Sequence, residues 1–260
     1  MLEKHTCNQK PLRVETLWTL YDMGVIRISS FSSVGERHLE TTTPLPISLD
    51  GDFIEIPKAH LQFSGMDDES TNTILMKTKV VAAQLERLRV FSESPAMKRR
   101  MVVYGPPGTG KSSTTLAWAA ARDPKCWLYL HVSIREDAFT TIIVDDGTRR
   151  TCRDFRTAER INEFMETIKM ETPILFVLDG FIENRSLDET LLGDSLRWLE
   201  KSDHKIRFIL NTSMSTADRK SLSPIYNEKM LIINWTLEEC VAAALHRPFF
   251  ERELCIFDGS

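Results

Sequence analysis

The chain has 260 residues, 42% of them hydrophobic, and a formal net charge of −4. This length allows a core of ordinary size in one or two domains. The slightly negative balance excludes the global basic field of a protein whose main partner is a nucleic-acid backbone. The five cysteines lack the paired spacing of a zinc site or a disulfide framework. We therefore expect reduced thiols and an intracellular protein.

The first 66 residues differ from those that follow, because serines and threonines cluster there and apolar periodicity is weak. We predict a small N-terminal appendage or leader over residues 1–66. Within it, the segments 47–49 and 53–56 flank Asp50-Gly51, which is a strong β-hairpin signal. The first ten residues lack the apolar stretch of a secretory signal, and no run of about 18 apolar residues occurs anywhere in the sequence. We therefore expect no membrane partner.

Residues 67–95 are predicted to connect this appendage to the main domain. Apolar side chains recur there at helical spacing from about residue 70 to 91, namely Ile74, Val81, Leu85 and Leu88. This pattern predicts an amphipathic helix that ends at Ser94-Pro95.

Residues 96–260 alternate short apolar runs with helical stretches, which predicts an α/β domain with a mostly parallel sheet and helices on both faces. Strands are expected at 101–104, 127–132, 174–178, 208–210 and 230–233, and helices at 112–122, 156–170, 187–200 and 237–245. Residues 140–148, with an Asp-Gly pair, predict an inserted β-ribbon.

The most specific motif follows the first of these strands and reads Gly105-Pro106-Pro107-Gly108-Thr109-Gly110-Lys111-Ser112, which matches G-x-x-x-x-G-K-[ST] at every fixed position. Backbone N–H groups of such a loop and the positive end of the next helix surround phosphates. Lys111 would neutralise the β and γ phosphates, and Ser112 would offer its hydroxyl to Mg²⁺. We therefore predict residues 105–113, including Ser113, as a binding set for ATP and Mg²⁺. ATP is the default because the chain lacks the N/T-K-x-D signature that reads guanine.

A second part of the site is predicted where the apolar run 174–178 ends in Asp179, at the place of a Mg²⁺-coordinating Walker B carboxylate. Many ATPases carry a Glu directly after that Asp to polarise the attacking water, but here the residue is Gly180. Glu183 is the nearby alternative as a catalytic base, although an exposed loop carboxylate is the simpler interpretation. We therefore expect slow hydrolysis.

The strand around Phe208–Leu210 ends in polar residues, where such sheets place a sensor of the γ-phosphate or of the attacking water. Asn211 is the predicted sensor, with Ser213 as the alternative, and a polar strand end that starts the next loop is an equally good interpretation. Arg219 is a candidate arginine finger, although a solvated arginine is the simpler interpretation. Arginines at 153, 156 and 160 are expected on one solvated helix face.

These residues together suggest a family. The loop 105–112, the strand end Leu178-Asp179-Gly180 and the segment Trp235-Thr-Leu-Glu-Glu239 resemble the P-loop module of Crinkler and retrotransposon hot spot (RHS) proteins, over about residues 95–245. The resemblance implies an ASCE-type NTPase sheet of order 5-1-4-3-2. It also implies a protein that can occur in the nucleus and that often carries a C-terminal effector domain. Since the chain ends at Ser260, we expect either that the helical lid and the effector domain are encoded elsewhere or that this is a truncated or divergent member.

Two functions remain open from the sequence: a P-loop ATPase with Lys111, Glu183 and Asn211 in catalytic roles, and a nucleotide-dependent interaction switch without significant turnover. An AAA+-like ATPase is a further alternative, because its P-loops often share this sequence, although the Glu after Asp179 and the lid are missing. A nucleotide kinase ranks last. The expected partners are a nucleotide and an unidentified protein, and nucleic acid only through a domain or partner outside this chain.

Overall fold

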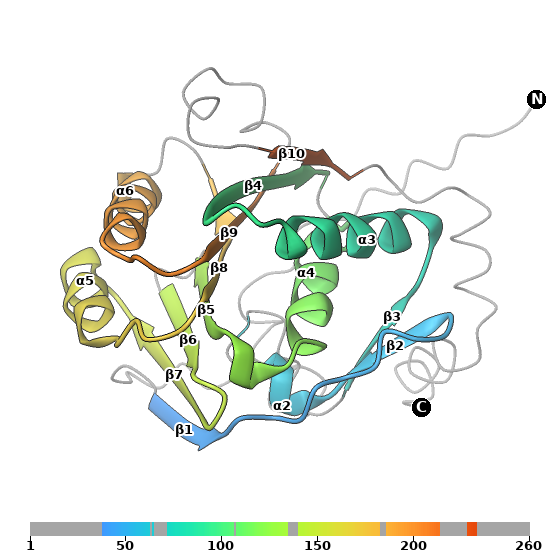
Figure 1. Ribbon diagram of the computed structural model, residues 1–260, viewed down its shortest axis with the longest axis horizontal. Coiled ribbons are helices and arrows are strands. Elements are labelled where there is room, and N and C mark those ends of the chain that lie inside the picture. Colours follow the sequence, from blue (N-terminus) through green and yellow to red (C-terminus); the bar gives the residue numbers. More distant parts are fainter. Residues whose placement is uncertain are drawn as a thin grey trace, which may run out of the picture. The chain divides into compact units, whose positions relative to one another are not determined.

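The fold centres on an eight-stranded sheet of order β1-β7-β6-β5-β8-β9-β4-β10 (Figure 1). The computed structural model describes residues 38–62, 64, 72–106, 108–134, 140–182, 186–213 and 228–232. The strands of this sheet are β1 (His38–Thr42), β4 (Lys98–Gly105), β5 (Leu128–Ile134), β6 (Thr140–Asp145), β7 (Arg149–Phe155), β8 (Ile174–Phe181), β9 (Ile206–Ser213) and β10 (Glu228–Leu231). A second sheet contains β2 (Phe53–Ile56) and β3 (Thr73–Met76). The helices are α2 (Lys58–Leu61), α3 (Lys79–Glu93), α4 (Lys111–Ala120), the 3-10 turn η1 (Pro124–Cys126), α5 (Ala158–Thr167) and α6 (Ser186–Glu200).

Five neighbouring strands of the large sheet run parallel, in the order β5-β8-β9-β4-β10. Read from the β10 edge, with the strands counted along the chain from β4, this order is 5-1-4-3-2. The strands β6, β7 and β1 extend the sheet in antiparallel fashion beyond β5. The molecule therefore has the predicted α/β class with a mostly parallel sheet.

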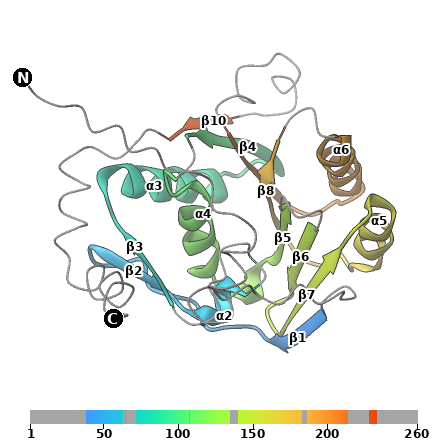
Figure 2. The ribbon, with the colours of Figure 1, turned by 180° about the vertical axis from the view of Figure 1, so that it is seen from behind.

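Helices cover both faces of the sheet, as Figures 1 and 2 show, with α3 and α4 on one side and α5 and α6 on the other. The strand residues alternate accordingly. On β8, Phe176 and Leu178 belong to the core beneath α5 and α6, whereas Leu175 and Val177 belong to the core beneath α3 and α4. Because parallel strands are buried on both faces, they read as continuous apolar runs in the sequence. No helix in the described part of the chain is both long and apolar enough to cross a bilayer.

The predicted hairpin at Asp50-Gly51 is wrong. The strand Phe53–Ile56 exists, but it pairs with Thr73–Met76 of β3 and not with residues 47–49. The Ile47 N–H instead donates to the carbonyl of Ala120 at the end of α4, 3.1 Å away, and Leu49 packs against the core next to α4. The strand β2 therefore pairs with the more distant β3 and not with the neighbouring residues 47–49. This arrangement buries Ile54 and Ile56.

Residues before position 66 also contact the main sheet and its core, so the predicted boundary of an appendage near residue 66 does not separate two sets of contacts. The strand β1 pairs with β7 in the main sheet, and Ile54, Ile56 and Leu61 lie in the same core cluster as α3 and α4. The chain divides at a different place, into Met1–Gly35 and Glu36–Ser260. Residues 38–62 are thus part of the unit that holds the P-loop.

The connecting helix starts later than the periodicity predicts. Thr73–Met76 forms β3, and helix α3 begins at Lys79 after Thr78, whose hydroxyl accepts a hydrogen bond from the Val81 N–H at 3.2 Å. An N-cap of this kind satisfies one of the first free N–H groups of a helix. Ile74 therefore belongs to a strand, although its spacing from Val81 matches a helix.

The predicted arginine face is also corrected. Arg153 lies on β7, opposite Ile142 of β6, and Arg156 precedes the start of α5, so only Arg160 is helical. The antiparallel partner β6 decides this, because it extends the predicted ribbon to Phe155. The guanidinium of Arg153 lies 4.9 Å from the ring centroid of Phe164 on α5, within cation–π distance.

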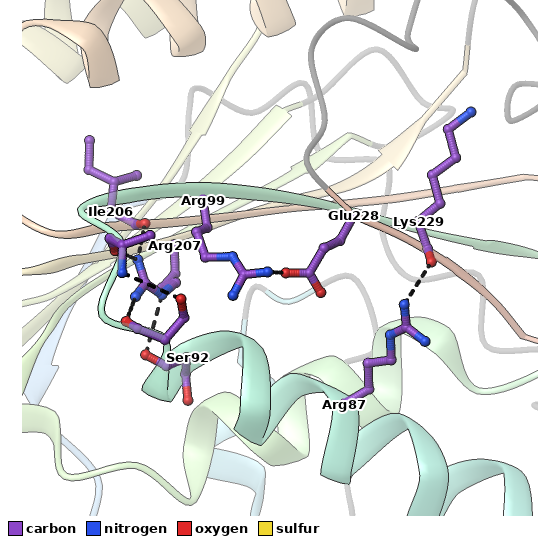
Figure 3. Close-up of polar contacts among 9 residues, drawn as sticks. Arg87, Ser92, Arg99, Ile206, Arg207, Glu228 and Lys229 are labelled. Atoms are coloured by element: carbon purple, nitrogen blue, oxygen red, sulfur yellow. Dashed lines mark hydrogen bonds and ion pairs between the residues drawn. The ribbon is translucent and has the colours of Figure 1, made fainter.

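A buried arginine joins α3 to the sheet. Arg207 at the start of β9 is 0% exposed, and its guanidinium donates to the carbonyls of Ser92, Ser94, Ala96, Met97 and Ile206 (Figure 3). The last carbonyls of a helix have no partner within the helix, so this cation supplies donors at the end of α3.

The same close-up shows how the edge strand β10 is attached. Arg99 of β4 pairs with Glu228, and Arg87 of α3 donates to the Lys229 carbonyl at 3.4 Å (Figure 3).

Candidate nucleotide-binding site

The P-loop connects β4 to helix α4 at the carboxyl end of the parallel strands. Gly110, the N-cap of α4, has a left-handed backbone with φ +80°, and the Thr114 N–H donates to its carbonyl at 2.8 Å. The helix thus starts at Lys111, and its first N–H groups have no partner within the helix. These groups and the helix dipole make the loop a site for an anion such as phosphate. Gly105 lies against the chain after β10, and a Cβ there would run into the carbonyl of Ile232.

The Lys111 side chain folds back into this loop. Its Nζ donates to the carbonyls of Gly105 at 2.9 Å and Pro106 at 2.7 Å. Burial lowers the pKa of Lys111, and the negative charge of Asp179 opposes this effect. The amino group is therefore held by neutral carbonyls, which phosphate oxygens can replace with a gain in electrostatic attraction.

Ser112 in the first turn of α4 contacts Asp179 near the end of β8, although they are 67 positions apart in the sequence. The Ser112 hydroxyl donates to Asp179 Oδ1 at 2.7 Å, and the Asp179 residue is only 7% exposed. Hydroxyl and carboxylate oxygens are the hard ligands that Mg²⁺ takes when its other ligands are water and phosphate. The donor atoms of this pair therefore fit the predicted ion.

The backbone geometry at position 180 explains why a glycine, and not a glutamate, follows Asp179. The φ of Gly180 is +84°, and a Cβ there would lie 2.6 Å from the carbonyl oxygen of Ile134 on β5. The pairing with β9 shifts at this point, so that Phe181 takes the next partner, Thr212. A side chain at position 180 would need both a strained backbone and a displaced β5, because left-handed backbone disfavours any residue with a Cβ.

The predicted sensor, Asn211, lies beside Asp179 on the neighbouring strand β9. Its Oδ1 accepts from the hydroxyl of Thr115 on α4 at 3.3 Å, and Gln84 of α3 donates to the same hydroxyl at 3.4 Å and to the Lys111 carbonyl at 3.1 Å. Asn211 is 2% exposed, and its Nδ2 has no hydrogen-bond partner within the described residues. The amide thus retains a free donor on the face of the sheet that carries Asp179.

A buried histidine that the sequence did not single out lies on the other side of Asp179. The Nε2 of His131 on β5 is 3.8 Å from Asp179 Oδ2, and its Nδ1 is 2.9 Å from the hydroxyl of Tyr129. Burial lowers the pKa of His131 to about 4, against the opposing effect of Asp179, so the imidazole is neutral near pH 7. A signal for it exists in the sequence: Tyr129, His131 and Ser133 alternate within a strand that is otherwise apolar, and a polar face is unusual on a central parallel strand.

The structure thus brings Lys111, Ser112, Asp179 and Asn211 to one end of the parallel sheet. Other predicted site residues lie outside the described residues: Pro107 of the loop, the candidate base Glu183, the candidate finger Arg219 and the Trp235–Glu239 segment, together with the helix expected at 237–245.

Comparisons with known proteins find similar folds among solved structures. The FIGL-1 AAA domain in complex with ADP matches with a TM-score of 0.37 and 13% identity, over 64% of this chain and 53% of its own. C. elegans PCH-2 matches with a TM-score of 0.39 and 14% identity, over 73% and 51%. The Aeropyrum pernix ORC1 protein in complex with DNA matches with a TM-score of 0.46 and 12% identity, over 70% and 51%.

The chain therefore spans about half the length of these structures. No family model and no curated protein matches it. Similarities of this extent carry no functional assignment, so the interpretation of the site rests on its own geometry.

Proposed function

We propose that this chain is a Mg²⁺-dependent ATP-binding P-loop NTPase with slow ATP hydrolysis, in a module similar to those of Crinkler and RHS proteins. The observation that carries the proposal is the 2.7 Å contact between Ser112 Oγ and Asp179 Oδ1, next to a loop that holds the Lys111 amino group. Sequence motifs for phosphate and for metal binding thus lie at one end of one sheet. The absence of a glutamate after Asp179 supports the family resemblance.

Each residue has a distinct role in this proposal. The loop N–H groups and Lys111 bind the β and γ phosphates, while Ser112 and Asp179 hold Mg²⁺ directly or through its water shell. Bound Mg²⁺ neutralises charge on the phosphate oxygens. The Nδ2–H of Asn211, which has no hydrogen-bond partner among the described residues, donates to the γ-phosphate or to the water that attacks it in line.

Binding of a fluorescent ATP analogue, with MgCl₂ and with EDTA, tests this function. Lys111→Ala removes the loop cation and should weaken binding at least about tenfold, since a hydrogen bond to a charged group contributes about 1.5–3 kcal/mol. Lys125→Ala, at an exposed lysine of η1, is the matched control and should bind like the parent chain. Asp179→Asn should lose the effect of Mg²⁺ and retain binding in EDTA. A parent chain that binds no nucleotide at millimolar concentration overturns the proposal.

A second candidate function is a nucleotide-dependent switch, which Gly180 favours because the geometry around it excludes a catalytic glutamate at this position. In this case a protein partner recognises the nucleotide-bound state of the chain. Phosphate release separates the two functions. An ATPase releases phosphate faster than Lys111→Ala, and Glu183→Gln slows it if Glu183 is the base, whereas a switch binds ATP but releases no more than the Lys111 variant.

A further inference from the structure

Two polar side chains of β5, the partly buried Tyr129 and the buried His131, lie on the face of the sheet that carries Asp179 of β8. Ser133 pairs with Asp179 in the parallel register of β5 and β8, so residues two and four positions earlier lie on the same face of the sheet. Within the described residues, His131 is 1% exposed and its Nε2 has no hydrogen-bond partner. Packing alone does not account for this arrangement, because burying an unpaired polar atom costs free energy that a leucine would not.

The chemistry of the Asp179 carboxylate, the His131 ring and the Tyr129 hydroxyl indicates which of them donates and which accepts. A carboxylate that serves Mg²⁺ is ionised and only accepts hydrogen bonds. The nitrogen of His131 that faces it, Nε2, must then carry the proton of the neutral ring. Nδ1 is consequently the acceptor, and the Tyr129 hydroxyl, 2.9 Å away, donates to it. The Tyr129 hydroxyl thereby stabilises the tautomer of His131 that presents an N–H to Asp179.

The second oxygen of Asp179 is the natural acceptor for that N–H. Ser112 occupies Oδ1 at 2.7 Å, whereas Oδ2 lies 3.8 Å from His131 Nε2, just beyond hydrogen-bond distance. If Ser112 turned its hydroxyl oxygen to Mg²⁺, its hydrogen bond to Oδ1 would weaken and the carboxylate would be free to rotate. A small rotation would then bring Oδ2 within reach of His131.

We propose that His131, oriented by Tyr129, is a positioning residue that holds the Asp179 carboxylate in the orientation that serves Mg²⁺. The inference rests on the proposed nucleotide-binding function and adds to it a pair of residues on a neighbouring strand. Groups that hydrogen-bond a metal ligand from behind orient it, and their loss typically weakens metal binding about 10- to 100-fold. No contact of His131 with the nucleotide is required.

The test is the Mg²⁺ concentration at half-effect in binding of a fluorescent ATP analogue to the full chain, together with the affinity in EDTA. His131→Leu removes the donor and should raise this Mg²⁺ midpoint about tenfold, with the EDTA affinity unchanged. His131→Gln places an amide N–H near the position of Nε2 and should return the midpoint to within about threefold of the parent. Tyr129→Phe removes only the hydroxyl and should give an intermediate midpoint.

The outcomes separate this inference from the proposed function. A parent chain that binds no nucleotide overturns both. A parent that binds with a clear Mg²⁺ effect, combined with an unchanged midpoint in His131→Leu, overturns the positioning role alone. Equal losses in His131→Leu and His131→Gln, or equal losses with Mg²⁺ and with EDTA, indicate packing and also overturn it. If His131→Leu fails to fold, Tyr129→Phe decides, and an unchanged midpoint in that variant refutes the inference.

Discussion

Replacing Gly180 by alanine should destabilise the chain more than the same change at Gly108 or Gly193. Two effects add at this position. A left-handed backbone costs a residue with a Cβ about 1–2 kcal/mol. The new Cβ would also lie 2.6 Å from the Ile134 carbonyl oxygen, so β5 or β8 must shift, and such overpacking costs about 1–3 kcal/mol. Together these terms predict a loss of about 2–5 kcal/mol in the free energy of unfolding.

Two other glycines separate these effects. Gly108 has φ +76°, and no atom lies within 4 Å of the place that its Cβ would take, so Gly108→Ala carries only the backbone term, about 1–2 kcal/mol. Gly193, within α6, has neither constraint, so Gly193→Ala should stabilise the chain by about 0.5–1 kcal/mol through helix propensity. The three variants form a matched series in which the same methyl group is added.

Urea unfolding monitored by circular dichroism, without nucleotide, measures the series. The expected order of midpoints is Gly193→Ala above the parent, then Gly108→Ala, then Gly180→Ala. If Gly180→Ala is as stable as Gly108→Ala, the close approach to Ile134 has no energetic effect and the reasoning fails. In that case the chain should tolerate Gly180→Glu as well. Our expectation is instead that Gly180→Glu destabilises the chain and gives no gain in phosphate release.

Other changes test the polar contacts that hold the fold together. Arg207→Met leaves several carbonyls at the end of α3 without their donor and should cost about 2–4 kcal/mol in urea unfolding, whereas Arg197→Met, at a side chain that is 78% exposed, should cost less than about 0.5 kcal/mol. Thr115→Val removes the hydrogen bond to Asn211 Oδ1 and should cost about 1–2 kcal/mol, which Thr115→Ser should largely restore. Burial lowers the pKa of His60 below its ordinary 6.5, so its contribution to stability is present above pH 6.5 and is lost as the pH falls through the folded-state pKa. Unfolding in urea from pH 7 to pH 5 should therefore show a steeper fall for the parent than for His60→Gln, and parallel curves would contradict this assignment.

The sequence was sufficient for the parts of the site that depend on local chemistry. A G-x-x-x-x-G-K-[ST] loop requires its residue types wherever it occurs, and a parallel strand buried on both faces remains visible as an apolar run. Lys111, Ser112 and Asp179 follow from these signals, and the structure brings them together. Asn211 also followed from its place at a strand end, although its contact with Thr115 did not.

Long-range pairing is where the sequence failed. Asp50-Gly51 carries a strong local signal for a hairpin, yet β2 pairs with β3 because that pairing buries apolar side chains beneath α4. Ile74 fits a helical period by chance, since a short strand precedes the N-cap of α3. Competing partners that are distant in the chain decided both cases.

The sequence by itself therefore determined which groups are available for phosphate and Mg²⁺, because those groups are encoded in short contiguous motifs. Only the tertiary structure decided how they are supported. It set the backbone of Gly180 against Ile134, and it aimed the imidazole of His131 at Asp179. Both depend on the register between β5 and β8, which brings residues about 45 positions apart side by side, and a linear pattern does not encode that register.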